Sequence, residues 1–454
     1  MNEELIAIFE SLLQSYQQRR FADLRMTLLD MEPADIALFM ENELDDTDKL
    51  KFFRMLPKEQ ASDVFIEIDT DTQEQLIKAF TDKELKAVID DMFLDDTVDV
   101  IEEMPANVVK RILKNSDPEN RKQINSLLEY PDDSVGSIMT TEYVSFSASF
   151  TVEEAFEKIR RIGLNKETIY TCYVTDRKKH LIGVVTVKDL LLAKKEDVIE
   201  NIMDTAVITV ETNEDKEQAV LKFSKYGFIA LPVVDKEGCL VGIVTVDDAV
   251  DVMQEEATED IQKMAAITPN EKPYLKQSAF SIWKARVPWL IILMLSATFT
   301  SLVLSGYESQ LKPVLYAFVP MLMGTAGNAG GQASVTVIRA LALEEVTFKD
   351  FFRVVWKELV ASVLLGLTVA IVCFGKLMLI DRIYDPSITW DIAGIISVVC
   401  FICVVLSKGV GCMLPMLAKK VKLDPAVMAS PLMTTIVDVL TLIIYCSISI
   451  AILG

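Results

Sequence analysis

Five apolar segments in the C-terminal part of this 454-residue chain are each long enough to cross a lipid bilayer. They are separated by short polar loops and cover residues 285–306, 313–338, 358–380, 392–418 and 426–453. A helix needs about 20 apolar residues to span the hydrocarbon core. The sequence therefore predicts a transmembrane domain of five helices within residues 281–454.

The charges divide the chain into two unlike regions. From Lys284 onward there are 13 Lys or Arg and 10 Asp or Glu residues, whereas the preceding residues carry 32 and 57. Such a contrast is typical of an acidic, water-exposed region joined to a membrane region. No nucleic-acid partner is expected for a chain with this balance.

The basic residues of the apolar region also predict its orientation. They gather before the first apolar segment, between the second and third, and between the fourth and fifth. Basic loops stay on the cytoplasmic side, and no export signal opens the sequence. We therefore expect a multi-pass plasma-membrane protein with its N-terminus in the cytoplasm and its C-terminus outside.

An internal repeat lies in the acidic region. HLIGVVTVKDLL at 180–191 matches CLVGIVTVDDAV at 239–250, and each follows a strand, a helix and a β-rich run. The two units, 131–200 and 201–252, resemble a tandem pair of CBS domains with an α/β fold. The resemblance implies that Thr186 with Asp189, and Thr245 with Asp248, hold the ribose of an adenine nucleotide such as ATP. The alternative is that these residues only cap the helices that follow them.

Carboxylates are concentrated in two predicted helical regions. Residues 1–130 read as all-helical, and spacing places Asp91, Asp95 and Asp99 on one helical face. A connecting helix of about 30 residues should follow the repeat and end near Pro269 or Pro273, with a carboxylate stripe formed by Asp247, Asp251, Glu255 and Glu259 and widened by Asp248, Glu256 and Asp260. Divalent cations would relieve the repulsion within these surfaces. The alternative is an ordinary solvated acidic face.

The second apolar segment contains the stretch PMLMGTAGNAGGQ, from Pro320 to Gln332. Glycines and buried amides weaken a plain lipid anchor, so something polar is expected close to this backbone. Irregular backbone there, and a break at Pro431, would present carbonyls to a wet cavity. The alternative is close helix packing through Gly324 and Gly331.

These features together resemble the MgtE family of magnesium channels and transporters. The glycine stretch matches the family's P-x-x-x-G-x-x-G-N-x-G-x-Q pattern, and the segment from Asp424 through Asp438 and the connector residues Glu255 to Ile261 match as well. The resemblance implies a multidomain membrane protein. Its parts would be an all-α N-terminal superhelical domain (1–130), tandem CBS domains, an acidic connecting or plug helix (253–280) and a five-helix transmembrane domain.

The resemblance also implies a homodimer with one Mg²⁺ pathway lined by the second and fifth spans, closed when cytosolic Mg²⁺ is high. The implied pore residues are Asp438, Asn328, Gly324, Gly327, Gln332, Thr434 and Thr435. The implied Mg²⁺-sensing residues are Glu59, Asp91, Asp95, Asp247, Asp248, Asp251, Glu255, Glu256 and Glu259.

Other readings of the same residues remain open. Asp438 could instead be a buried partner of Lys408, and the substrate could be another divalent cation such as Co²⁺, Ni²⁺ or Mn²⁺. A membrane-tethered enzyme or receptor is the remaining class. The sequence contains no nucleophile with a partnering base, no phosphate-binding loop and no His or Cys cluster, so no enzyme is expected.

Overall fold

The computed structural model describes residues 3–270, 274–307, 310–428 and 430–453. The chain forms two compact units, Met1–Val252 and Met253–Gly454. Each unit has a hydrophobic core of its own. All seven cysteines are free thiols, and five of them are buried in the membrane unit.

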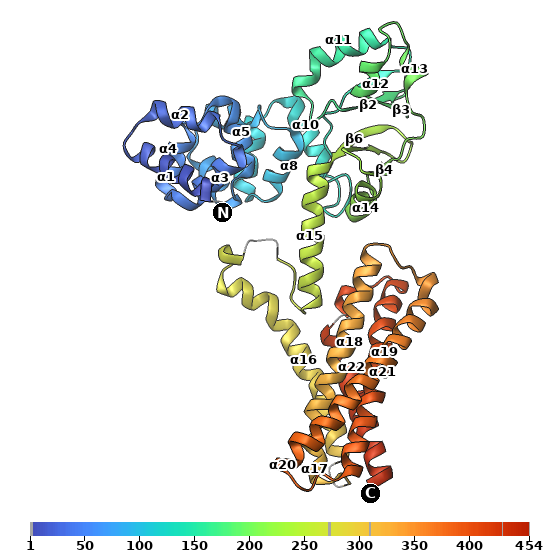
Figure 1. Cartoon of the computed structure of the whole chain (residues 1–454). Helices are drawn as coiled ribbons and strands as arrows, with labels where there is room; N and C mark the ends of the chain where they lie inside the picture. The colour runs from blue at the N-terminus through green and yellow to red at the C-terminus, as the bar shows by residue number, and fades with distance from the viewer. Residues whose placement is uncertain (1–2, 271–273, 308–309, 429, 454) are drawn as a thin grey trace. The chain divides into compact units, whose positions relative to one another are not determined.

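The first unit begins with short helices, each built on a few buried apolar residues (Figure 1). Helices two positions apart pack together, for example α3 on α5 and α5 on α7. The helices are α1 Glu3–Gln17, α2 Phe21–Leu29, α3 Pro33–Glu43, α4 Asp46–Phe53, α5 Lys58–Glu67, α6 Thr70–Ala79, α7 Asp82–Ile89, α8 Leu94–Glu102, α9 Ala106–Asn115 and α10 Pro118–Leu127.

The internal repeat forms two matching units, each with a three-stranded sheet. In both sheets the first strand is parallel to the second, and the second is antiparallel to the third. The first contains β1 Ser145–Ser147, α11 Val152–Ile162, β2 Thr171–Thr175, β3 Leu181–Thr186, α12 Val187–Leu192 and α13 Ile199–Ile202. The second contains β4 Val210–Glu211, α14 Lys216–Tyr226, β5 Ala230–Val234 and β6 Leu240–Thr245. The repeat prediction is therefore confirmed.

The connecting helix is shorter than predicted. Helix α15 runs over Val246–Met264, 19 residues, and not about 30. Ala266 has a positive φ of 53°, and the amide of Ile267 donates to the carbonyl of Gln262 at 2.9 Å. This left-handed turn closes the helix before either proline is reached.

The second unit is built mainly from long helices that pack side by side (Figure 1). The long helices are α16 Ala279–Tyr307, α18 Val319–Ala342, α19 Phe351–Lys376, α21 Trp390–Lys420 and α22 Ser430–Leu453. Short helices, α17 Pro313–Tyr316 and α20 Arg382–Tyr384, and short turns at Phe348–Asp350 and Ala426–Met428 lie between them. Within the described ranges, four segments are long and apolar enough to cross a membrane: Ala279–Tyr307, Phe348–Tyr384, Trp390–Lys420 and Leu432–Ile452. Helix α18, which carries the glycine stretch, is 24 residues long and is not among these four.

Helix α18 is continuous through the glycine stretch, so the prediction of irregular backbone there was wrong. The predicted break at Pro431 falls at the start of α22, because this residue lies in the first turn of that helix and a separate short turn, Ala426–Met428, precedes it. The packing glycine is Gly330, whereas an added Cβ at Gly324 would meet nothing within 4 Å. A Cβ on Gly411 of α21 would collide with the carbonyl of Gly330, lying 2.9 Å from its carbon atom. Backbone contact between α18 and α21 therefore requires both glycines.

We expect Gly411→Ala to destabilise the membrane unit. The new methyl group would meet rigid backbone, and overpacking of this kind costs about 1–3 kcal/mol. Gly409→Ala on the same helix is the matched control, because a Cβ there has no neighbour within 4 Å. Thermal unfolding of the full chain in detergent measures both variants. Equal melting temperatures for the two would contradict the proposed contact.

Candidate cation-binding sites

The first candidate site is built around the start of α8. Phe93 is extended and ends the preceding turn, and the amide of Leu94 donates to Glu142 Oε2 at 3.1 Å. This hydrogen bond holds the first turn of α8 next to Glu142, which precedes the first strand of the repeat. Asp95 follows directly; it is only 9 % exposed, and its Oδ1 has no hydrogen-bond partner. Burying a carboxylate oxygen without a hydrogen-bond partner costs free energy unless a proton or a cation binds to it.

Further carboxylates from the repeat units surround α8. We call this group the acidic cluster: Asp95, Asp96, Asp99, Glu142, Glu167, Asp247 and Asp248. Within the described part of the chain, none of the seven forms an ion pair with a Lys or Arg. The fold thus holds seven acidic side chains together, and among the described residues Lys166 acts on one of them, Glu142, from beyond ion-pair distance.

Burial and mutual repulsion raise the proton affinity of these groups. Burial first, and then Asp248 and Asp247, raise the pKa of Asp96 to about 7. Burial and the nearby Asp96 raise the pKa of Glu167 to about 7. Burial raises the pKa of Asp248 to about 6, although its hydrogen bond with Thr245 acts in the opposite direction. At neutral pH the cluster therefore carries negative charge at an electrostatic cost.

A divalent cation is the ligand that this chemistry fits. Carboxylate oxygens are preferred by Mg²⁺ and Ca²⁺, and Mg²⁺ usually keeps several of its waters. Among the described residues, however, no three acidic, His or Cys side chains already converge on one metal position. Ions bound here would therefore bridge carboxylates through water or draw the side chains closer together.

The structure brings together only part of the predicted sensing set. Asp95, Asp247 and Asp248 belong to the acidic cluster. The prediction that Asp91 shares a helical face with Asp95 was wrong. Helix α7 ends at Ile89 and α8 begins only at Leu94, so Asp91 lies between the two helices. Asp91 instead accepts a hydrogen bond from Ser62 at 3.1 Å.

The remaining predicted residues lie elsewhere. Asp251 is exposed and faces Glu67, whose pKa is raised by burial and by this neighbour. Glu255, Glu256 and Glu259 follow along α15, in the second compact unit. Glu259 pairs with Lys263, its Oε1 lying 2.6 Å from Nζ. The side chain of Glu59 lies outside the described residues.

Two members of the acidic cluster were missed from the sequence. Glu142 stands just before β1 and Glu167 just before β2, each in an ordinary connecting segment. Neither belongs to a charge run, so no local pattern marks them. Only the packing of the repeat units on α8 brings them to the cluster.

We expect the first unit to lose stability as pH rises from 5 to 8 without divalent cations. A carboxyl group whose pKa is higher in the folded state than in the unfolded state binds its proton more tightly when folded. Its contribution to stability is fully present below the unfolded pKa near 4 and is lost as pH rises through the folded pKa values of about 6 to 7. The melting temperature of a soluble fragment ending after Met264 should fall by roughly 5 °C or more. Asp96→Asn combined with Asp248→Asn should flatten the profile, and an unchanged slope would contradict this origin.

The second candidate site lies in the membrane unit, where α18 leaves a polar face uncovered. Gly324, Asn328 and Gln332 are spaced four residues apart and are all exposed. The opposite face is buried, with Gly330 against Ser407 and Met433. A helix in lipid would normally turn its polar groups inward, so this face differs from an ordinary lipid-facing surface.

Helix α22 brings Asp438 to the edge of this face. A Cβ on Gly327 would lie 3.5 Å from Cγ2 of Thr434, so α18 and α22 touch at this level. Asp438 lies one helical turn beyond Thr434 on the same side of α22 and is half-buried. Thr435 is next to Thr434 and is also half-buried. The predicted pore residues thus lie on two helices that contact each other.

Lys408 does not pair with Asp438. Its Nζ lies 3.1 Å from Oε2 of Glu358, which ties α21 to α19. The alternative role of Asp438 as the partner of Lys408 is therefore wrong. Its carboxylate remains available for another cation.

The end of α15 contacts the loop that precedes α22. Nζ of Lys263 lies 2.8 Å from Oδ2 of Asp424, and Met264 packs against Ile338 and Ala426. Because α22 carries Asp438, this contact links the connecting helix to the helix of the second site.

The Thr and Asp pairs of the nucleotide pattern act as helix caps. Thr186 and Asp189 form a capping box at α12, and Thr245 Oγ1 donates to Asp248 Oδ2 at 2.6 Å. The capping alternative is therefore observed. It does not prevent the same side chains from holding a ribose.

Comparisons with known proteins agree with this layout. Residues 31–133 match the model of the MgtE intracellular N domain, residues 135–196 and 199–255 match the CBS domain, and residues 319–448 match a divalent cation transporter model, MgtE. The magnesium transporter MgtE of Thermus thermophilus is 36% identical over 457 residues, covering 98% of both chains. This chain belongs to the MgtE family of magnesium transporters. The MgtE of Bacillus subtilis is 30% identical over 95% of this chain and 94% of its own.

Two solved structures each match just over half of this chain. The cytosolic domain of the Mg²⁺ channel MgtE, solved in complex with ATP, is 34% identical with a TM-score of 0.51, covering 54% of this chain and 99% of that one. The soluble part of a magnesium transporter is 29% identical with a TM-score of 0.52, covering 56% and 99%. As a member of the MgtE family, the chain is a multi-pass membrane transporter with an N-terminal helical domain and two CBS domains.

Proposed function

We propose that the protein carries Mg²⁺ into the cell across the plasma membrane and that cytosolic Mg²⁺ closes it. The observation that carries the gating proposal is the acidic cluster. The seven carboxylates form no ion pair with a Lys or Arg within the described residues, and one of them, Asp95, is buried with an unpaired oxygen. Cations would stabilise the packing of α8 on the CBS units, and their loss would leave the carboxylates to repel one another.

The proposed pathway runs along α18 and α22 of two chains. The uncovered polar face with Asn328 and Gln332 supports a homodimer in which Asp438 attracts the hydrated ion. This assignment adds α18 to the four apolar spans, so that the chain has five spans and α18 is the second in chain order. Its low apolar content then reflects contact with the pathway, and the positive-inside rule puts the N-terminus in the cytoplasm.

The contact between Lys263 and Asp424 offers a route from sensor to pathway. Binding at the start of α15 would change the position of this helix, and the ion pair would pass the change to the loop before α22. A ligand shifts such an equilibrium only by its difference in affinity for the two states. Several ions acting together would make the response steep.

The test is a flux assay on the full chain in liposomes that contain a Mg²⁺ indicator. Flux should occur with Mg²⁺ outside and should fall when Mg²⁺ is raised on the side of the acidic cluster. Flux that ignores Mg²⁺ on that side would contradict the gating. Parallel assays with Co²⁺, Ni²⁺ and Mn²⁺ test the alternative of another divalent cation. ATP added on the same side tests a nucleotide role for the CBS domains, for which the ATP complex of a related cytosolic domain is the support.

A further inference from the structure

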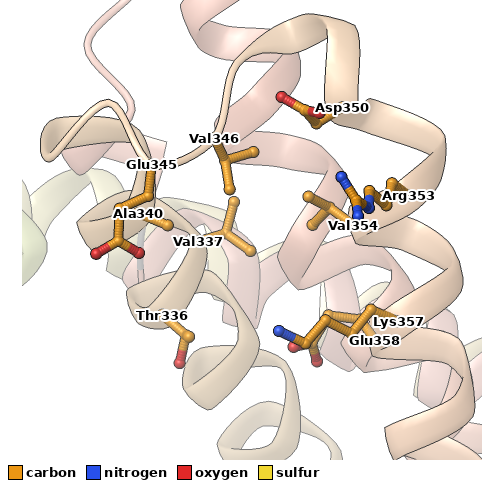
Figure 2. Close-up of a pocket in the computed structure, with 10 residues that line it drawn as sticks. All are labelled: Thr336, Val337, Ala340, Glu345, Val346, Asp350, Arg353, Val354, Lys357 and Glu358. Atoms are coloured by element: carbon orange, nitrogen blue, oxygen red, sulfur yellow. The ribbon is translucent and has the colours of Figure 1, made fainter.

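A charged pocket lies between α18 and the start of α19, and its Thr336 follows Gln332 of the second candidate site by one helical turn. Its volume is about 430 Å³, and it is lined by Thr336, Val337, Ala340, Glu345, Val346, Asp350, Arg353, Val354, Lys357 and Glu358. Figure 2 shows Arg353 and Lys357 on α19 with their nitrogen-bearing ends on the side of α18.

The two cations of this pocket have no carboxylate within ion-pair distance among the described residues, although Arg353 interacts with Asp350 at longer range. Neither Arg353 nor Lys357 forms an ion pair with any residue that the structure describes. They are spaced four residues apart, so both project from one face of α19. An anion could therefore contact both at once.

The carboxylates of the pocket are mostly occupied. Asp350 accepts hydrogen bonds from the amide and the hydroxyl of Thr347, at 3.1 and 3.0 Å. Glu358 lies 3.1 Å from Nζ of Lys408. Only Glu345 remains, and it is exposed at the rim. With Lys408 counted, the formal charges around the pocket balance, so an anion would be held by the direct contacts that Arg353 and Lys357 leave unfilled.

The position of the pocket indicates which kind of anion it could bind. Lys357 and Glu358 are followed by an apolar run without charge up to Gly375, so the pocket lies at one boundary of a membrane-spanning helix. Phe352 and Trp356 beside it are 83 % and 66 % exposed. Exposed aromatic residues next to basic ones are typical of the lipid headgroup level, where basic pockets between helices bind anionic lipids.

We propose that this pocket binds the phosphate headgroup of an anionic phospholipid, held by Arg353 and Lys357. Val337, Val346 and Val354 provide apolar contacts for the glycerol carbons. The proposal does not depend on the transported ion or on the direction of transport.

The test is native mass spectrometry of the delipidated full chain with phosphatidylglycerol or phosphatidylcholine. The protein should retain one phosphatidylglycerol per chain, bound roughly thirty-fold more tightly than phosphatidylcholine. Arg353→Gln with Lys357→Gln should remove this preference, and Lys357→Arg should keep it. Lys284→Gln with Arg286→Gln is the matched control, since it removes one Lys and one Arg from the start of another span.

Several results would overturn the proposal. They are equal binding of the two lipids by the unaltered chain, loss of preference in the control pair, or retention of preference in the pocket pair. Displacement of the lipid by millimolar inorganic phosphate would assign the pocket to a soluble anion. If the unaltered chain forms a dimer and binds no lipid, the pocket is instead filled by the partner chain. Melting temperatures of the variants separate loss of binding from loss of folding.

Discussion

Asp438→Asn should lower Mg²⁺ flux through the reconstituted protein at least about 100-fold. The substitution keeps the size of the side chain and removes its charge. Two unit charges 4 Å apart attract by about 4 kcal/mol at an effective dielectric constant of 20, and the ion is doubly charged. Asp438 lies beside the uncovered polar face of α18, where no described basic residue competes for it. The measurement is initial Mg²⁺ entry into liposomes that hold an indicator dye.

Two further variants make this result specific. Asp391→Asn neutralises an exposed carboxylate in the first turn of α21 and should leave flux within about two-fold of the unaltered chain. Asp438→Glu keeps the charge and should retain part of the flux. If Asp438→Asn conducts as well as the control, the pathway does not use this carboxylate.

Asp95→Asn should remove most of the response of the first unit to Mg²⁺. In the unaltered fragment ending after Met264, Mg²⁺ at about 100 times its dissociation constant should add about 2.7 kcal/mol, or roughly 5–10 °C in melting temperature. Asp95 is buried with an unpaired Oδ1, and its removal weakens the electrostatic field of the whole cluster. The same substitution should raise the melting temperature without Mg²⁺, because it relieves repulsion.

The opposite signs of these two effects separate a cation site from a simple packing defect. A defect would lower stability both with and without Mg²⁺. Glu157→Gln is the control: this exposed carboxylate of α11 has no ion pair among the described residues and should change neither value. In the full chain, Asp95→Asn should leave flux high at Mg²⁺ concentrations that close the unaltered protein. Normal closure would show that the gate does not depend on Asp95.

The arrangement of the domains could be predicted because its signals are local in the sequence. Apolar runs, a repeated strand pattern and helical periodicity each depend on residues near one another in the chain. The predictions that failed depended on where helices begin, end and touch. Asp91 was assigned to the face of Asp95 because the spacing is correct, yet Phe93 is extended and separates them.

Packing decided the roles that spacing left open. Gly324 and Gly331 have the spacing of a contact motif, but the close contact belongs to Gly330 because it faces Gly411. Lys408 could have paired with any carboxylate of the membrane unit, and the packing of α19 on α21 selected Glu358. Glu142 and Glu167 join the acidic cluster although no sequence pattern marks them.

The sequence by itself determined that this chain has an acidic soluble region, two CBS units and membrane helices with a polar stretch. Burial of apolar surface and hydrogen bonding along the backbone act on neighbouring residues, so composition and periodicity are enough to reveal them. Only the tertiary structure decided which charges meet. Coulomb interactions and backbone contacts change over a few ångströms, and distances between residues far apart in the chain are set by how the helices pack.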